Sequence, residues 1–333
     1  AGSLAGNIAL ALTSNANGLA GLTNEALVGQ SVAVSGAAYD LARATLASGT
    51  LAMGNVRLGQ SVAMGVTNTA TTDAAFQDSL DVVATAANGK LTFANPARLA
   101  AGATGTVTLT AATAGLLDGP VAVGLTSNAN GLAGLTNVGL TGQSVAVTGA
   151  AYDFAQPTVA ATLALGNVRA RSAGSLAVTN AVVTDAAFQD SLDVTATTAV
   201  ANLAVTAPGN ILAGQTRAVG VAIGDAGSLA GTIVLGLSSN ANGVADLQGR
   251  TFADRTVTVT GAAYDLAQAT VAPALTLGNV RVGAANPLAV TNTVFLSAAY
   301  QDSLDVVAAS ANAKLGFANP AKIDAGLSGD VAV

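Results

Sequence analysis

Hydrophobic and polar residues alternate along many short segments of this chain. In QSVAMGVTNT (60–69) the apolar side chains are Val62, Met64 and Val66, and GNIALALTS (6–14) alternates in the same way. Residues two apart share one face of a strand, so this pattern predicts half-buried strands, and no segment sustains a helical period. Seven such strands are predicted, over residues 50–59, 60–69, 76–84, 89–94, 105–111, 6–14 and 30–40.

Turn residues separate the predicted strands. Asn-Gly pairs tolerate positive φ, and three of them follow strongly alternating segments: Asn17-Gly18, Asn130-Gly131 and Asn242-Gly243. A second predicted turn is marked in each repeat by a dipeptide whose second residue is proline: Asn95-Pro96, Ala207-Pro208 and Asn319-Pro320. Strands at this spacing, divided by turns of this kind, are typical of an all-β sandwich.

Five short motifs each occur three times at a nearly constant spacing. SNANG begins at Ser14, Ser127 and Ser239, spacings of 113 and 112 residues. The other four keep this register: GAAYD begins at Gly36, Gly149 and Gly261, GNVR at Gly54, Gly166 and Gly278, and QDSLD at Gln77, Gln189 and Gln301, while VTN ends at Asn68, Asn180 and Asn292. This period is too long for a solenoid turn and fits one sandwich domain. The sequence therefore predicts tandem immunoglobulin-like β-sandwich domains, about 112 residues per repeat.

The repeated motifs resemble a known family. The combination of GNVR, VTN and an aromatic-x-x-Ser-Leu segment in residues 161–194, with SVAVTGAAYD at 144–153, resembles the bacterial immunoglobulin-like repeats of the choice-of-anchor D type. These are distantly similar to the ASH and major-sperm-protein-like sandwiches. The resemblance covers essentially the whole chain, and it implies tandem sandwiches in secreted or cell-surface proteins, with no catalytic residues. The Asp-rich QDSLD and the low aromatic content of 3% depart from the family pattern.

The resemblance also implies domain boundaries, because a domain of that family opens before GNVR and closes near GAAYD. Complete domains are then expected at 44–155 and 156–267. Residues 1–43 are expected to be the C-terminal strands of one immunoglobulin-like domain, and residues 268–333 the N-terminal strands of another.

Three interpretations of these incomplete ends follow. The chain is a window cut from a longer repeat protein, or an isolated fragment with open sheet edges. Alternatively, copies complete each other head to tail, with residues 1–43 of one filling the sandwich begun by residues 268–333 of the next. A head-to-tail contact of this kind does not close, so it propagates as a filament. The expected partners are therefore copies of the chain or further repeats of it.

Composition excludes several classes of function. The chain has no Cys and no His, which removes the usual ligands of zinc and copper as well as Cys-His and Ser-His-Asp catalysis. The formal net charge of −6 offers no basic stripe for nucleic acid or for an anionic membrane surface. The mean hydropathy is +0.55, but no run of 18 apolar residues predicts a membrane span.

Asp78 and Asp81 stand three residues apart in QDSLD, and paired acids can serve catalysis or hold a metal. On a strand these two side chains point to opposite faces, so we expect separate, solvated carboxylates and no glycoside-hydrolase pair. Calcium is the alternative, because hard cations bind several oxygen ligands. The candidate calcium ligands are Asp73, Asp78, Asp81, Asp185, Asp190, Asp193, Asp302 and Asp305, although Ser297 replaces the first Asp in the third copy. No other cofactor is predicted.

Three further sets of residues recur. The arginines of GNVR, Arg57, Arg169 and Arg281, are expected to form an ion pair within the repeat or to bond loop carbonyls, with a ligand clamp as the alternative. Tyrosines and aspartates end each repeat and are expected at the junctions between domains: Tyr39, Asp40, Tyr152, Asp153, Tyr264 and Asp265. SNANG is interpreted as a hairpin turn, with a recognition loop as the alternative. The segments DLARATLAS (40–48) and DFAQPTVAA (153–161) are interpreted as short linkers.

These observations predict a non-enzymatic structural protein. The favoured function is a component of a bacterial extracellular filament or surface layer that assembles head to tail through its repeats. The alternative is the stalk of a cell-surface adhesin whose binding domain lies outside this segment. Both place the chain at the cell surface. An adhesin predicts monomers with saturable glycan binding, whereas a structural component predicts polymers.

Overall fold

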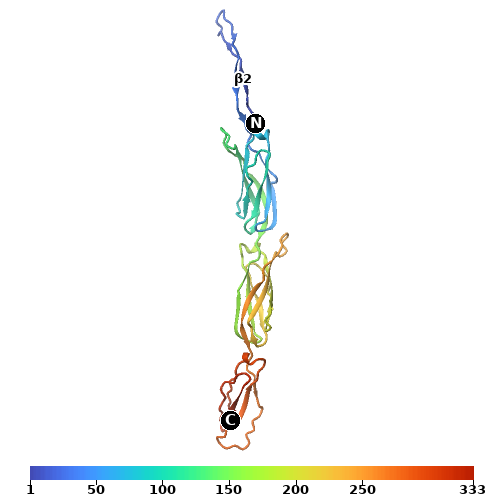
Figure 1. Ribbon diagram of the computed structural model, residues 1–333, viewed down its shortest axis with the longest axis vertical. Helices are drawn as coiled ribbons and strands as arrows, with labels where there is room; N and C mark the ends of the chain where they lie inside the picture. Colours follow the sequence, from blue (N-terminus) through green and yellow to red (C-terminus); the bar gives the residue numbers. More distant parts are fainter. The chain divides into compact units, whose positions relative to one another are not determined.

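The computed structural model describes residues 1–333 and consists of β-strands with three short 3-10 turns (Figure 1). The chain divides into two compact units, one of residues 1–153 with 244–247 and one of residues 154–243 with 248–333. No helix in the structure is long and apolar enough to span a membrane.

The first unit contains one complete sandwich, which we call the first sandwich (residues 44–152). One sheet has the order β11 (Leu91–Ala94), β12 (Thr104–Ala111), β9 (Ser61–Asn68) and β7 (Ala44–Leu46). The other has the order β10 (Ser79–Ala86), β14 (Gly119–Asn128), β16 (Gln143–Tyr152) and β8 (Thr50–Arg57), with the short strands β13 (Gly115–Leu116) on β16 and β15 (Val138–Gly139) on β14. A 3-10 turn, η1 (Ala74–Phe76), precedes β10.

This strand order is that of an immunoglobulin-like sandwich. Lettered in chain order, β7, β9, β12 and β11 form the A–B–E–D sheet, while β10, β14 and β16 form the C–F–G sheet. Strand β8 joins the second sheet at its outer edge and runs parallel to β16, and the other pairs named are antiparallel. The predicted fold class, tandem immunoglobulin-like sandwiches, is confirmed.

The core of the first sandwich consists of small aliphatic side chains from the inner faces of both sheets. The period-2 pattern places Met64 and Val66 on one sheet against Leu80, Val82 and other buried residues of the facing sheet. Alternate residues of β14 and β16 complete the core: Val121, Val123, Leu125, Val145 and Val147. Burial of these faces supplies the main favourable free energy of the sandwich.

The parallel β8–β16 pair depends on a glycine. The register of this pair shifts between Thr148 and Gly149, and Gly149 has a φ of +148°. A Cβ atom at Gly149 would lie 2.5 Å from the carbonyl oxygen of Gly54, so only glycine allows the two backbones to approach this closely. The same arrangement recurs in the second unit between Gly261 and Gly166.

Residues 1–38 of the first unit form what we call the N-terminal hairpin. Its strands pair only with each other, as β1 (Gly2–Ser3) with β6 (Ala37–Ala38), β2 (Gly6–Leu10) with β5 (Gln30–Val34) and β3 (Thr13–Ser14) with β4 (Glu25–Ala26). Figure 1 shows this hairpin in blue, with β2 labelled and no third strand beside it.

The second unit contains another complete sandwich, the second sandwich (residues 157–264). Its first sheet has the order β17 (Pro157–Val159), β19 (Ala173–Asn180), β23 (Thr216–Ile223) and β21 (Leu203–Thr206). Its second has the order β18 (Thr162–Arg169), β27 (Arg255–Tyr264), β25 (Gly231–Asn240), β20 (Ser191–Thr198) and β22 (Gly209–Ile211), with β24 (Gly227–Ser228) on β27, β26 (Arg250–Thr251) on β25 and the turn η2 (Ala186–Phe188) before β20. The topology repeats that of the first sandwich, with β22 added where the first has only an isolated bridge between Leu80 and Leu99.

The second unit ends in what we call the C-terminal module (residues 268–333). It has one three-stranded sheet, β28 (Ala269–Val271), β29 (Pro287–Asn292) and β30 (Ser328–Ala332), and a turn η3 (Ala298–Tyr300). In immunoglobulin lettering these strands are A, B and E, and the C–F–G sheet is absent. Only Val290, Ile323 and Val331 form its buried core.

The two segments predicted to be linkers contain strands. Ala44–Leu46, within 40–48, is β7 and pairs with β9, and Pro157–Val159, within 153–161, is β17 and pairs with β19. The linker prediction was therefore wrong for these residues. Their alternation is too short to identify as a strand, and they become ordered because an edge of the A–B–E–D sheet is open beside them.

Candidate functional site

The C-terminal module and the N-terminal hairpin carry the features that the complete sandwiches do not explain. Counterparts can be matched through the repeat, because they lie 112 residues apart between the second sandwich and the C-terminal module, as in Gln189 and Gln301. Between the N-terminal hairpin and the second sandwich they lie 225 residues apart, as in Ser14 and Ser239.

Two segments of the C-terminal module lack the strand structure of their counterparts. Residues 274–281 match β18, and residues 303–310 match β20, but neither segment forms a strand. Residues 303–310 keep only an isolated bridge between Leu304 and Ile323. In the second sandwich, β18 is held by β27 and β20 by β25, and no such pair is present in this module. Both segments therefore lack a hydrogen-bonding partner strand.

The N-terminal hairpin has the opposite deficiency. It matches β25 and β27, which lie between β18 and β20 in the second sandwich. Ile8 and Leu10 of the hairpin are 53% and 38% exposed, whereas their counterparts Ile233 and Leu235 are completely buried. Val32 and Val34 are likewise exposed, and their counterparts Val257 and Val259 are buried. The hairpin is thus the central strand pair of a sandwich without its neighbours.

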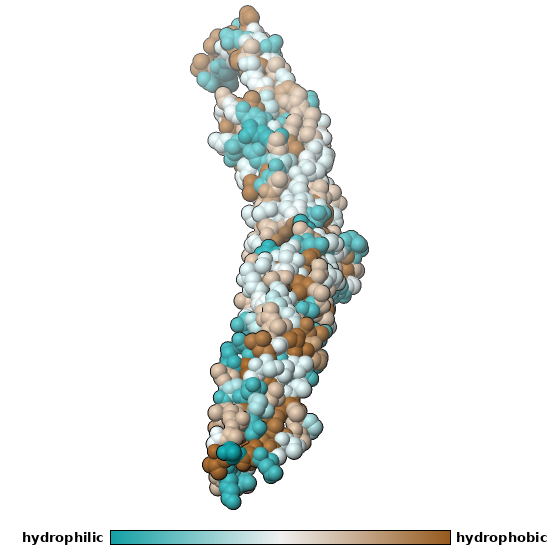
Figure 2. All heavy atoms as spheres, turned by 60° about the horizontal axis from the view of Figure 1, so that its bottom comes forward, coloured by the Kyte–Doolittle hydropathy of each residue, from teal (hydrophilic) through white to brown (hydrophobic).

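The surface of the C-terminal module holds an open groove of about 490 Å³. Leu277, Leu315, Phe317 and Val333 supply much of its apolar lining, and Lys314 lies at its polar side. Apolar atoms gather at this end of the chain, the lower end of Figure 2. At the matching positions of the second sandwich, Leu203 belongs to the buried core, and Leu165 and Val205 are partly buried and pack against it.

A buried asparagine organises each copy of the QDSLD turn. Asn68 Nδ2 donates to the carbonyl oxygens of Asp78 and Leu99, at 3.0 and 3.1 Å. Its Oδ1 accepts from Gln77 Nε2 and from the backbone N–H of Arg43. The same set of bonds recurs around Asn180 and Asn292. In the sequence, VTN served only as a repeat marker, although the joint recurrence of its Asn and of Gln77 is a signal for this hydrogen-bonded pair.

Asp78 is 4% exposed, so the prediction of a solvated carboxylate was wrong at this position. It precedes β10 and accepts a hydrogen bond of 2.8 Å from Ser127 Oγ, which in turn accepts from the N–H of Ala42. Asp190 is equally buried and accepts from Ser239 Oγ at 2.6 Å. Each buried carboxylate bonds to a serine 49 residues later in the chain, and no local sequence pattern reveals this partner.

The C-terminal module has no serine at this position, because the matching residue belongs to the strands it lacks. Asp302 there forms an ion pair with Arg169 at 2.6 Å and is about one-third exposed. The matching serine of the N-terminal hairpin is Ser14, which is exposed. One half of a recurrent buried hydrogen bond therefore lies in each incomplete part of the chain.

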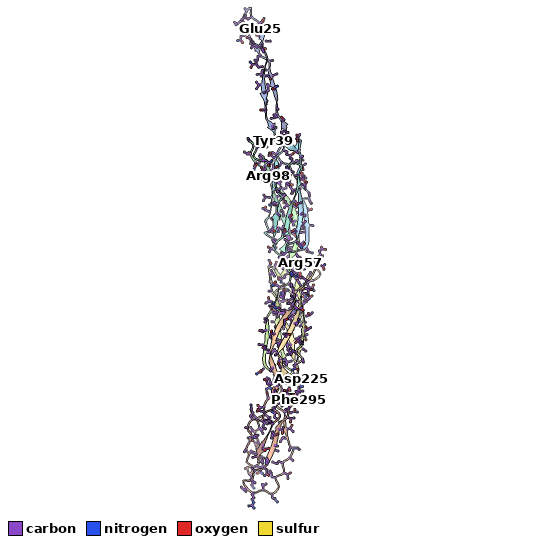
Figure 3. All side chains as sticks on the ribbon, viewed as in Figure 1. Glu25, Tyr39, Arg57, Arg98, Asp225 and Phe295 are labelled. Atoms are coloured by element: carbon purple, nitrogen blue, oxygen red, sulfur yellow. The ribbon has the colours of Figure 1, made fainter.

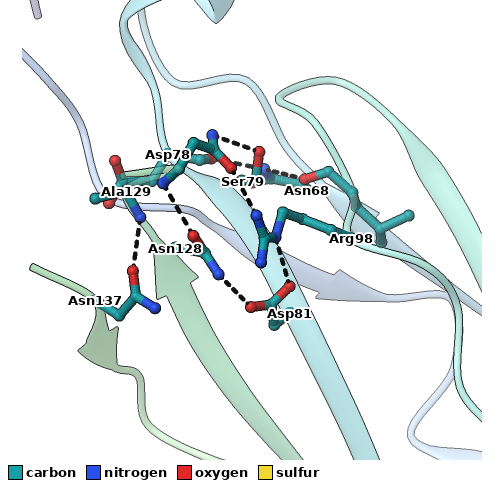
Figure 4. Close-up of polar contacts among 10 residues, drawn as sticks. Asn68, Asp78, Ser79, Asp81, Arg98, Asn128, Ala129 and Asn137 are labelled. Carbon is teal, nitrogen blue, oxygen red and sulfur yellow. Dashed lines mark hydrogen bonds and ion pairs between the residues drawn. The ribbon is translucent and has the colours of Figure 1, made fainter. Parts of the chain in front are cut away.

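Asp81 occupies a different environment from Asp78, as their spacing predicts. Its carboxylate accepts hydrogen bonds from Arg98 Nε at 3.0 Å and from Asn128 (Figure 4). Burial alone would raise the pKa of Asp81, but the hydrogen bonds from Asn128 and Arg98 and the charge of Arg98 outweigh it, so its pKa lies below the ordinary value. Asp193 accepts from Asn210 and Asn240 instead, and Asp305 is exposed.

The remaining calcium candidates serve as turn caps. Asp73 Oδ1 accepts from the N–H of Ala75, and Asp185 does the same for Ala187, while Ser297 makes no such bond. No group of three or more acidic side chains gathers where it could hold a metal ion. The calcium site stays a prediction.

The predicted junction residues follow or end the last long strand of each repeat. Within the first unit, the ring of Tyr39 lies 5.6 Å from that of Phe76, at the base of the hairpin in Figure 3. Asp40 bonds through its backbone to Phe76 and Asp78. Within the second unit, Tyr264 lies 5.8 Å from Tyr300, and Asp265 bonds to Tyr300 and Asp302. Tyr152 ends β16, and Asp153, which follows it, is buried.

Arg57 and Arg169 lie at the same end of their sandwiches. Arg57 donates to the carbonyl oxygen of Asp153, and Arg169 pairs with Asp302. Arg281 lines the groove of the C-terminal module. The SNANG turns have the predicted positive φ at the second Asn of each motif, at Asn17, Asn130 and Asn242.

No protein-family model matches this chain, and no curated protein matches it. Solved structures similar to it include an I-band fragment of titin, with 11% identity, 74% of each chain covered and a TM-score of 0.30. The D00-D0 domain of intimin has 12% identity and a TM-score of 0.29, with 65% of this chain and 99% of that one covered. Domains 4–9 of the surface layer protein SbsC have 16% identity and a TM-score of 0.23, and this chain covers 37% of that one. The fold assignment rests on the strand order described above.

Proposed function

We propose that this chain is a structural, non-enzymatic component of an extracellular filament or surface layer, assembled head to tail through its sandwich repeats. The observation that carries the proposal is the complementarity of the two incomplete parts. The N-terminal hairpin exposes an apolar face whose counterpart in the second sandwich is buried. The C-terminal module lacks the strand pair that corresponds to this hairpin. Exposed apolar faces and open edges of this kind favour association.

The junctions described above support a mechanical role. Asp40 donates its backbone N–H to Phe76 at 2.9 Å and accepts from the N–H of Asp78, so the last strand of one repeat bonds directly to the turn of the next. Asp265 repeats this with Tyr300 and Asp302. Backbone bonds combined with an aromatic contact restrict bending at these two junctions more than a free linker would.

The polar residues that first suggested chemistry also fit a structural role. Asp78 holds Ser127, Asp81 holds Arg98 and Asn128, and Asp73 caps a turn. Each of these bonds joins or orients strands of the sandwich. The acidic, Cys-free composition rich in Ala, Thr and Gly, which is common among bacterial surface proteins, supports the extracellular setting.

The proposal can be tested on the purified chain of residues 1–333. We expect its mean mass in light scattering to rise with concentration and electron micrographs to show linear polymers with a regular axial repeat. A folded chain that stays monomeric at high concentration would contradict assembly and favour the adhesin-stalk hypothesis. Glycan-array binding by that monomer would then be the next measurement.

A further inference from the structure

We propose that the C-terminal module of one copy is completed by the N-terminal hairpin of a second copy, in the register of the second sandwich. The inference rests on the proposed head-to-tail function and adds the residues that meet. The occupant is a second copy because the chain itself shows, in each complete sandwich, which strands belong in the empty positions.

The antiparallel register follows from the β20–β25 pair. There Leu192 pairs with Ser239, Val194 with Leu237 and Ala196 with Leu235. In the completed module, Leu304 therefore pairs with Ser14, Val306 with Leu12 and Ala308 with Leu10 of the second copy. Residues 304–309 already alternate between half-buried and exposed side chains, as a strand with one inner face requires.

The parallel register follows from the β18–β27 pair. Leu163 pairs with Val259, Gly166 with Gly261 and Arg169 with Tyr264. In the completed module, Leu275 pairs with Val34, Gly278 with Gly36 and Arg281 with Tyr39 of the second copy. Glycine is present at both positions of the close backbone approach, and Gly278 already has a φ of +62°, near the +68° of Gly166. The GNVR segment is therefore shaped for a partner strand that it lacks within the module.

The apolar contacts match as well as the backbone. Ile8, Leu10, Val32 and Val34 would meet the inner face of the C-terminal module, where Leu304, Val306 and Phe317 lie at the edge of its small core. In the second sandwich the counterparts of the four hairpin residues are all completely buried. Completion thus removes from water the exposed apolar faces of both parts.

The groove of the C-terminal module receives the first residues of the hairpin. In the second sandwich, Leu229 is completely buried, and a Cβ at Gly227 would lie 2.6 Å from the side chain of Asn202. The counterparts of these residues are Leu4, Gly2 and Lys314. Lys314 lines the groove, and Leu4 is 55% exposed. Leu4 of the second copy therefore enters the groove between apolar side chains such as Leu277 and Phe317.

Polar groups complete the match. Ser14 of the second copy takes the place of Ser239, donating to Asp302 and accepting from the N–H of Ala267, the counterpart of Ala155. Asn15 takes the place of Asn240, which donates to Asp193, and so bonds Asp305. Asp302 is paired with Arg169 in the single chain, and completion adds a charge-assisted hydrogen bond from Ser14.

Disulfide trapping tests this register, because the chain has no cysteine of its own. Ala9 and Ala309 are exposed and small, and their counterparts Val234 and Thr197 pair directly. One preparation carries Ala9→Cys and the other, with a longer tag, carries Ala309→Cys. With one cysteine per chain, a mixed disulfide can form only between two copies. Val307→Cys is the matched control, displaced by two residues on the same outer face, where the Cα separation disfavours a disulfide.

We expect the mixed Ala9→Cys and Ala309→Cys disulfide to form at least tenfold faster than the Ala9→Cys and Val307→Cys disulfide. Equal rates, or a faster control, would overturn the proposed register. Light scattering on the wild-type chain is measured separately. Polymers without the selective disulfide would leave the structural function standing and refute strand completion, whereas monomers would refute both.

Discussion

Ser127 Oγ donates a hydrogen bond of 2.8 Å to the buried carboxylate of Asp78, across 49 residues of sequence. The same hydroxyl accepts a hydrogen bond of 2.8 Å from the N–H of Ala42. It therefore joins the end of β14 to the QDSLD segment and to the residues that precede β7. Ser239, Asp190 and Ala155 repeat the arrangement. This contact, which the sequence did not predict, closes the end of each complete sandwich.

Removing this hydroxyl should destabilise the first sandwich. In Ser127→Ala, both Asp78 and the N–H of Ala42 lose a buried partner, which costs about 1–3 kcal/mol of unfolding free energy. Urea unfolding measures the change. Ser144→Ala, on the exposed side of β16, is the matched control and should change stability by less than about 0.5 kcal/mol. Equal effects of the two substitutions would contradict the role assigned to Ser127.

A side chain at Gly149 should disrupt the parallel β8–β16 pair. Alanine there must adopt a φ near +148° and places Cβ 2.5 Å from the carbonyl oxygen of Gly54. Backbone strain alone should cost about 1–3 kcal/mol in Gly149→Ala, and hydrogen exchange should become faster across β8. Gly139→Ala is the control, because a Cβ there meets nothing within 4 Å. Unchanged exchange in β8 would show that the close approach is not required.

The lowered pKa of Asp81 predicts acid sensitivity. A carboxylate whose pKa is lower in the folded state contributes stability above its unfolded pKa of about 3.9, and loses it as pH falls through the folded pKa. In Asp81→Asn, we expect lower stability at pH 7 and a smaller loss of stability between about pH 5 and pH 2 than in wild type. Denaturant unfolding at each pH measures this. Glu25→Gln, at the exposed tip of the hairpin, should leave the profile unchanged, and a wild-type profile in Asp81→Asn would refute the assignment.

A charge on the inner face of the hairpin should abolish assembly. Ile8→Asp places a carboxylate where its counterpart Ile233 is completely buried, so polymerisation should require about 100-fold more protein, or fail. Ala9→Ser lies on the opposite face of the same strand and should assemble like wild type. Light scattering against concentration compares the two. Normal assembly by Ile8→Asp would exclude this face from the contact.

Loss of the proposed bond between Ser14 and Asp302 of a second copy should weaken assembly less than Ile8→Asp does. Ser14→Ala leaves Asp302 without its buried donor after completion, and losing one charge-assisted hydrogen bond of about 1.5–3 kcal/mol should weaken assembly about 10- to 100-fold. Ser31→Ala on the same hairpin is the control, because its counterpart Thr256 is exposed. Critical concentrations from sedimentation measure both. If Ser31→Ala weakened assembly as much as Ser14→Ala, the bond would be refuted.

Local rules were sufficient for much of the fold. The alternation of Val62, Met64 and Val66 predicted β9, and the Asn17-Gly18 type of turn has the positive φ expected of it. Local rules were insufficient where partners are distant. Asp78 was predicted to be solvated, but its partner is a serine 49 residues away in the sequence. Residues 44–46 were interpreted as a linker, but they form a strand by pairing with the edge of β9.

Local patterns of residues were enough to predict the strands, their inner faces and the turns, and the spacing of five motifs was enough to predict the repeat. Which faces are covered depends on strands that lie far apart in the chain. Ile8 and Ile233 occupy the same position of the same repeat, yet one is exposed and the other buried. A strand buries its face and pairs its backbone only when the neighbouring strands are present. β25 has β20 and β27 beside it, whereas β2 has β5 alone.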